Sequence, residues 1–121
     1  MIQKNSVLDV QDMNGVLTVR CFHTYKQFSR NVSSSGLVIK SSVRLHNKKR
    51  KKWKGKKSKA VVTMTRSRFM KPDGSQIFGY KNGCGLLKKR LSLRGKLVRG
   101  YNFYNLKKKK FLTSFASVIY V

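Results

Sequence analysis

Positive charge restricts what this chain can fold into more than any other feature of its sequence. The 29 Lys and Arg residues face only three acids, Asp9, Asp12 and Asp73, which gives a formal net charge of +26. Self-repulsion on this scale destabilises a compact state in free solution, and a polyanion would cancel it. Each contact with a phosphate would also release condensed counterions. Nucleic acid is therefore the first partner that the sequence predicts.

An anionic membrane is the second candidate partner. However, the apolar stretches are far shorter than the ~20 residues that a membrane-spanning helix needs. The Lys-rich segments also do not alternate with apolar residues at helical spacing, as a helix lying on a membrane would require. We therefore expect no membrane partner.

Catalytic and metal-binding classes have little support in the sequence. General acid–base and metal-assisted chemistry usually draw on Asp, Glu or His, and beyond the three Asp the chain offers only His23 and His46. No phosphate-binding glycine loop, nucleophile elbow or paired Cys-x-x-Cys motif occurs. We expect a protein that is not an enzyme and that carries no cofactor and no metal.

The two cysteines, Cys21 and Cys84, each lie in an apolar run that is typical of a strand. Buried structural thiols are the simpler interpretation, and a disulfide between them stays open. Cys21 and His23 are two residues apart, so both would lie on one face of a strand. A zinc site would need a second closely spaced pair of ligands, which the sequence lacks.

Short apolar runs between turn signals indicate an all-β barrel or sandwich in one domain spanning residues 1–121. Asn14-Gly15 predicts a tight hairpin between the runs at residues 6–10 and 16–22, and Pro72-Asp73-Gly74-Ser75 predicts a second turn. Further strands are predicted at residues 36–45, with a solvent-facing middle at 40–42, and at 60–65, 76–80 and 84–87. Residues 24–35 are interpreted as a loop or a flexible hairpin tip, and Gly79, Gly83 and Gly85 as turn or bulge positions. Residues 91–121 form a distinct C-terminal region with a strand near 96–98 and short helical turns.

Basic segments at residues 48–59, 66–71, 88–99 and 107–110 are the candidate nucleic-acid contacts. They have no acidic counterpart, so on a compact barrel they would cover much of the surface. Lys binds phosphate as a point charge and reads bases poorly, which favours recognition of backbone and shape. Trp53 could stack on a base or pack on the barrel, and both remain open. The candidate RNA-binding residues are Lys48, Lys49, Arg50, Lys51, Lys52, Trp53, Lys54, Lys56, Lys57, Lys59, Arg66, Arg68, Lys71, Arg94, Lys96 and Arg99.

Several motifs resemble the universal large-subunit ribosomal protein L-fourteen family. They are the opening Met1-Ile2-Gln3, the stretch with Leu8, Asp9, Val10, Asp12 and Gly15, Cys21, and the block Pro72-Asp73-Gly74-Ser75 followed by Ile77, Asn82, Cys84, Leu86 and Leu87. The match keeps register from Met1 to Leu87. Beyond that point only Gly95, Gly100 and Phe111 align.

This resemblance implies a closed five-stranded β-barrel with a projecting β-ribbon and a C-terminal region holding short helices. It implies a structural constituent of the large ribosomal subunit that binds large-subunit rRNA near the subunit interface. It further implies contacts with ribosomal protein L-nineteen, with small-subunit rRNA through an intersubunit bridge, and with a ribosome-silencing factor. The alternative that composition alone permits is a free architectural nucleic-acid-binding protein of an organelle.

Departures from the family bear on where the protein works. The loop at residues 48–57 is nearly pure Lys and Arg, Tyr101 replaces a proline, and the tail lacks acids. Together with the richness in Lys, Asn, Phe and Tyr, this drift indicates an AT-rich organellar genome. The N-terminus shows neither a secretory signal nor an amphipathic presequence. We expect the mitochondrial matrix, within the mitoribosome, with a plastid or the bacterial cytoplasm as alternatives.

Overall fold

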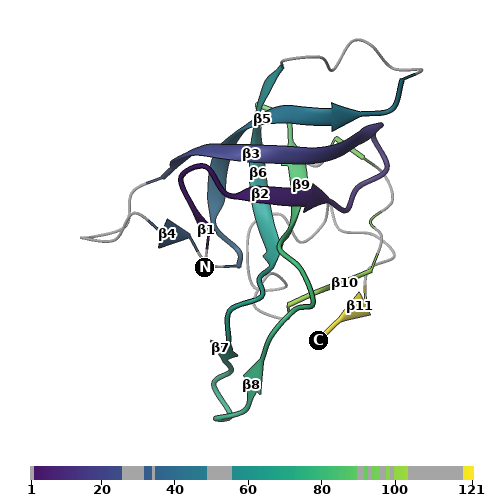
Figure 1. Cartoon of the computed structure of the whole chain (residues 1–121). Helices are drawn as coiled ribbons and strands as arrows, with labels where there is room; N and C mark the ends of the chain where they lie inside the picture. Colours follow the sequence, from purple (N-terminus) through teal and green to yellow (C-terminus); the bar gives the residue numbers. More distant parts are fainter. Residues whose placement is uncertain are drawn as a thin grey trace.

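The structure is a computed structural model that describes residues 2–25, 32–33, 35–48, 56–89, 92, 94–95, 98, 100–103 and 119–121. Its centre is a closed barrel whose strands are hydrogen-bonded in the order β2 (Val7–Val10), β3 (Val16–Thr24), β5 (Val38–His46), β6 (Lys57–Met64) and β9 (Gly83–Leu87) (Figure 1). Neighbouring strands are antiparallel except β2 and β9, which pair in parallel and close the barrel. The predicted all-β fold with a closed five-stranded barrel is confirmed.

The remaining strands form small sheets beside the barrel. β1 (Ile2–Gln3) pairs with β4 (Val32–Ser33), β7 (Phe69–Met70) pairs with β8 (Gln76–Ile77), and β10 (Tyr101–Asn102) runs parallel to β11 (Ile119–Tyr120). The β7–β8 hairpin points away from the barrel (Figure 1). We call this hairpin, together with the two chain segments that lead into and out of it (its legs), the ribbon (residues 66–82). The described residues contain no helix, and the short helical turns predicted after residue 91 fall largely on positions outside them. No helix in the described part of the chain is long and apolar enough to cross a membrane.

The barrel interior is filled by apolar side chains that alternate along the strands, as the period of two requires. The core cluster comprises Ile2, Leu8, Val16, Val19, Cys21, Ile39, Val43, Ala60, Val62, Cys84 and Leu86. β6 is buried on both faces, which explains its nearly continuous apolar sequence. The chain after the barrel strands reaches β6, where the Phe103 amide donates to the Thr63 carbonyl over 3.2 Å.

The predicted β2–β3 hairpin is present, and Asn14 and Gly15 hold its turn in different ways. Only Gly15 has a positive φ, of 93°, whereas Asn14 holds the turn through its side chain. The Val16 amide donates to Asn14 Oδ1, and Asn14 Nδ2 donates to Asp12 Oδ2, each over 3.0 Å. The amide of Asn14 thus replaces a second left-handed residue as the stabilising element.

The Pro72-Asp73-Gly74-Ser75 turn forms as predicted and connects β7 to β8. Gly74 has a φ of 90°, the left-handed conformation that glycine adopts without penalty. Asp73 Oδ1 accepts hydrogen bonds from the Ser75 hydroxyl over 2.7 Å and from the Ser75 amide over 3.0 Å. These bonds lower the pKa of Asp73, the hydroxyl having the larger effect.

Cys21 and Cys84 are buried free thiols, as the simpler interpretation held. Burial raises the pKa of both thiols. The expected shared face of Cys21 and His23 was wrong, because a bulge at Phe22 shifts the β3–β5 register between them. Cys21 faces the core and His23 faces outward, and the described residues hold no cluster of metal-ligating side chains.

Three further local predictions differ from the structure. Ser41 is fully buried instead of facing solvent, because its hydroxyl donates to the Ser58 carbonyl across β5 and β6 over 3.2 Å. Gly85 is neither a turn nor a bulge residue but pairs in regular register with Val61 in the middle of β9. Residues 32–33, interpreted as part of a loop or a flexible hairpin tip, form β4 by pairing with β1.

Asp12 links three parts of the fold that are distant in sequence. Its carboxylate accepts from the Leu86 amide in β9 over 3.3 Å and from Asn14 in the hairpin turn, and Asp12 forms an isolated bridge with Val98. Only 3% of the residue is exposed. Burial raises the pKa of Asp12 from 3.8 to about 6, although hydrogen bonds from the backbone oppose the shift.

We predict that Asp12 makes stability fall as pH rises from about 4 to about 6. In this window the folded protein holds a proton that the unfolded chain has released, so rising pH favours unfolding by about 3 kcal/mol in total. Asp12→Asn should remove this pH dependence while leaving the contribution of Asp73, whose pKa is lowered in the fold. Thermal unfolding of both proteins at constant ionic strength measures it, and equal pH slopes would contradict the assignment.

We also predict that Gly95→Ala destabilises the fold. A Cβ at residue 95 would lie 2.8 Å from the Asp12 Cβ, which is a backbone-anchored atom that cannot move aside. Overpacking of this kind costs roughly 1–3 kcal/mol. Urea unfolding measures the loss, with Gly74→Ala as a comparison in which the added Cβ meets no atom within 4 Å and only the φ is strained. Wild-type stability of Gly95→Ala would refute the close contact.

Candidate nucleic-acid interface

Strand register places cationic residues side by side on the outside of the barrel. β5 and β6 pair Lys40 with Lys59, and β6 and β9 pair Lys59 with Leu87. Both lysines therefore occupy neighbouring positions although they are far apart in sequence. Like charges directly opposite one another destabilise a sheet unless an anion lies between them.

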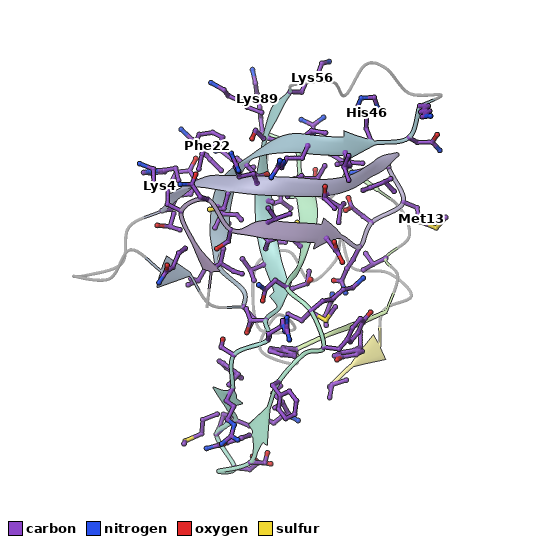
Figure 2. All side chains as sticks on the ribbon, in the orientation of Figure 1. Lys4, Met13, Phe22, His46, Lys56 and Lys89 are labelled. Atoms are coloured by element: carbon purple, nitrogen blue, oxygen red, sulfur yellow. The ribbon has the colours of Figure 1, made fainter. Side chains whose placement is uncertain are left out.

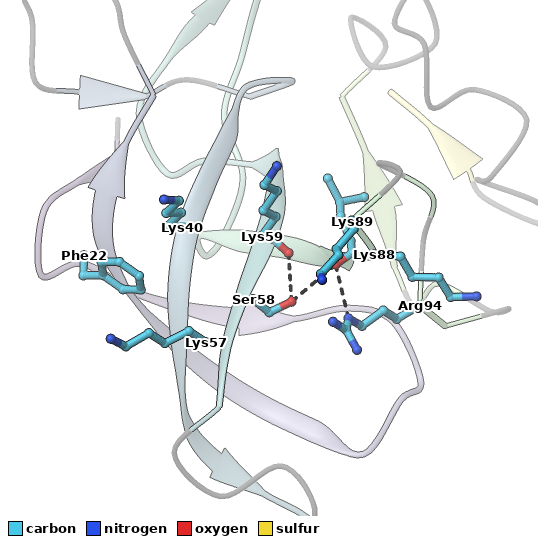
Figure 3. Close-up of a pocket in the computed structure, with 9 residues that line it drawn as sticks. Phe22, Lys40, Lys57, Ser58, Lys59, Lys88, Lys89 and Arg94 are labelled. Carbon is cyan, nitrogen blue, oxygen red and sulfur yellow. Dashed lines mark hydrogen bonds between the residues drawn. The ribbon is translucent and has the colours of Figure 1, made fainter.

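A groove of about 390 Å³ opens at this row of residues. We call it the lysine groove, and Figure 3 shows that strands β3, β5, β6 and β9 and the chain after β9 all contribute to it. Its lining residues are Phe22, Lys40, Lys57, Ser58, Lys59, Leu87, Lys88, Lys89 and Arg94.

Hydrogen bonds fix the backbone under the groove. Ser58 Oγ lies 3.3 Å from the Leu87 carbonyl and 3.2 Å from the Lys59 carbonyl, to which it donates. Arg94 Nε donates to the same Leu87 carbonyl over 3.2 Å (Figure 3). The Lys88 amide donates to the Ser92 carbonyl over 2.8 Å, which turns the chain back toward β9. The cationic side chains thus project from a backbone that these hydrogen bonds hold in place.

Aromatic rings orient several of the ammonium groups. Lys40 Nζ and Lys59 Nζ lie 5.6 Å and 5.9 Å from the centroid of the Tyr25 ring, and Lys57 Nζ lies 5.7 Å from that of Phe22. Cation–π contacts of this length hold a charge in place without neutralising it. The ammonium protons stay available to an anion.

No carboxylate is among the residues that line the lysine groove. Of the three acids in the sequence, Asp9 pairs with Lys81 at 3.2 Å, Asp12 is buried, and Asp73 lies in the β7–β8 turn. The groove can therefore bind an extended polyanion, because phosphate oxygens would accept from several cationic donors at once.

The structure brings only some of the sequence-predicted residues together. Lys57, Lys59 and Arg94 line the lysine groove. Lys56 lies at the same end of the molecule as Lys89 (Figure 2). Lys48 is exposed just after β5, and Arg66, Arg68 and Lys71 belong to the ribbon. Candidates at positions outside the described residues are Lys49, Arg50, Lys51, Lys52, Trp53, Lys54, Lys96 and Arg99.

Sequence reasoning missed Phe22, Lys40, Lys88 and Lys89 as members of one site. Lys88 and Lys89 open a segment already recognised as basic, so the charge run was a usable signal for them. Lys40 stands alone in an apolar run, and only the β5–β6 register reveals that it lies beside Lys59.

The chain matches the family of ribosomal protein L14p/L23e over residues 1–119. The chain belongs to this family. It is also 40% identical to the large ribosomal subunit protein uL14m of Tetrahymena pyriformis over 121 aligned residues, which cover 98% of this chain and 100% of the relative. The resemblance to the L-fourteen family is thus confirmed, and it extends through the C-terminal region, where only Gly95, Gly100 and Phe111 align with the family's motifs.

Membership in the family establishes a structural constituent of the large ribosomal subunit, not an enzyme. The relative is a mitochondrial ribosomal protein, which confirms the mitochondrial localisation expected from composition and sequence drift. The barrel, the ribbon and the lysine groove described above are therefore features of a mitochondrial member of the L-fourteen family.

Proposed function

We propose that this protein binds large-subunit rRNA mainly through the phosphate backbone and that the lysine groove is a principal contact. The observation that carries the proposal is the Lys40–Lys59 pair, two like charges held opposite each other in a groove without a carboxylate. Phosphates between these side chains would convert a repulsive pair into an attractive arrangement. The other predicted cations, Lys48, Lys49, Arg50, Lys51, Lys52, Lys54, Lys56, Lys96 and Arg99, would add further phosphate contacts.

In this proposal the energetic role of the protein is to neutralise the phosphate charge of rRNA. RNA helices repel one another through their phosphates, and a rigid barrel coated with cations lets them approach. Because Lys prevails over Arg in the groove, the contact would depend little on base sequence.

The finer assembly contacts belong to the same proposal through family membership. They include a position near the subunit interface and a contact with L-nineteen. An intersubunit bridge to small-subunit rRNA and docking of a silencing factor would involve the C-terminal region. Cross-linking of assembled mitoribosomes followed by mass spectrometry tests each neighbour separately.

We predict that Lys57→Gln with Lys88→Gln weakens binding to transcribed mitochondrial large-subunit rRNA and reduces the slope of log K against log salt by about 2. Each lost phosphate contact removes about one released counterion. Filter binding over a series of KCl concentrations, with tRNA as competitor, measures both quantities.

The matched control is Arg20→Gln with Arg44→Gln, which removes the same charge from exposed positions of β3 and β5 that do not line the groove. It should keep nearly the wild-type slope. Equal losses in the two double variants would mean that total charge, not the lysine groove, determines binding.

A further inference from the structure

The projecting ribbon exposes large apolar side chains that the barrel does not cover. Phe78 is 67% exposed, Tyr80 is 63% exposed, and Met70 at the end of β7 is 64% exposed. Figure 1 shows the ribbon standing clear of the barrel, so the fold itself buries little of this surface. Covering exposed aromatic rings with a partner is favourable, because it removes apolar surface from water.

Contacts at the base of the ribbon hold the aromatic segment in place. The Gly79 amide donates to the Thr65 carbonyl over 2.7 Å, and a Cβ at Gly79 would come within 3.0 Å of the same oxygen. Gly79 therefore lets the two legs of the ribbon approach between the rings of Phe78 and Tyr80. Substitution of this glycine would push the legs apart.

Tyr80 is oriented by its neighbours although most of the residue is exposed. Its ring lies 6.0 Å from that of Tyr101 at a tilt of 56°, and Lys81 Nζ lies 5.3 Å from its centroid. Lys81 is in turn held by Asp9 at 3.2 Å. The ring thus loses little further freedom when a flat group stacks on its exposed part.

Charge around these rings favours a nucleotide over a protein face. Arg66 and Arg68 are exposed on the other leg of the ribbon, and the Arg66 amide donates to Asn82 Oδ1 over 3.0 Å, which brings the legs together. The acid of the ribbon, Asp73, is held in the turn by Ser75. An unpaired nucleotide offers a base to stack and a phosphate to pair with arginine, whereas an apolar protein surface would leave the guanidinium groups unpaired.

We propose that the ribbon captures unpaired bases of rRNA by stacking them on Phe78 and Tyr80, with Arg66 and Arg68 holding the adjoining phosphates. This inference rests on the proposed binding of rRNA and adds a second kind of contact. The lysine groove binds backbone charge, while the ribbon binds the faces of bases. It therefore recognises single-stranded nucleotides such as those of a loop or bulge.

The two contacts differ in their dependence on salt, and that difference is the test. Phe78→Ala should weaken binding of the full chain to mitochondrial large-subunit rRNA roughly 10-fold, with the salt slope unchanged, because stacking releases few counterions. Tyr80→Ala should behave alike, whereas Tyr80→Phe should bind as the wild type does. Because both side chains are exposed, the variants should fold, which far-ultraviolet circular dichroism checks.

Phe78→Leu is the decisive control, because it keeps an apolar side chain and removes the ring. Weak binding of Phe78→Leu, together with ultraviolet cross-links from Phe78 or Tyr80 to nucleobases in the large subunit, supports stacking. Wild-type binding of Phe78→Ala or of Phe78→Leu would overturn it, and so would cross-links that lead only to a protein neighbour.

Failure of the stacking proposal is distinguishable from failure of the proposed function. If rRNA binding stays salt-dependent and sensitive to Lys57→Gln with Lys88→Gln but indifferent to Phe78, the ribbon proposal alone is wrong. If the chain does not select large-subunit rRNA over tRNA at all, the proposed function itself fails.

Discussion

Unbalanced positive charge on a small barrel is the constraint on which the rest of this structure depends. With three acids for 29 basic residues, the fold cannot pair its surface charges internally. None of the three acids lines the lysine groove. Asp12 is buried and joins the hairpin turn to β9 through hydrogen bonds. A polyanion would neutralise this surface charge. Membership in a ribosomal protein family makes rRNA the expected polyanion.

The barrel determines where the charge is concentrated. Closure through the parallel β2–β9 pair fixes the register of the sheet, and that register aligns Lys40, Lys59 and the end of β9 on the outer surface. Ser58 and Arg94 tie the backbone beneath them to Leu87. The ribbon adds a second exposed surface, on which aromatic rings lie beside arginines. The interior thus stabilises the fold, while the outer faces remain available for RNA.

Much of the fold was predictable from the sequence because turn residues have local causes. Gly15 and Gly74 adopt positive φ where the sequence indicated turns, and the apolar runs became barrel strands. The predictions failed where strand register determines which way a side chain faces, because composition does not reveal β-bulges. The bulge at Phe22 places His23 and Cys21 on different faces of β3. The charge runs identified Lys57, Lys59 and Arg94, but Lys40 joined the lysine groove only through pairing with β6. The burial of Ser41 was not predicted, because the carbonyl that accepts its hydrogen bond lies on another strand.

The most direct measurement is a cryo-electron microscopy structure of the mitochondrial large subunit that contains this protein. We predict rRNA phosphates in the lysine groove, with oxygens within about 4 Å of the ammonium groups of Lys40, Lys59 and Lys57. A groove that faces solvent, or one occupied by the acidic side chains of a protein neighbour, would contradict it.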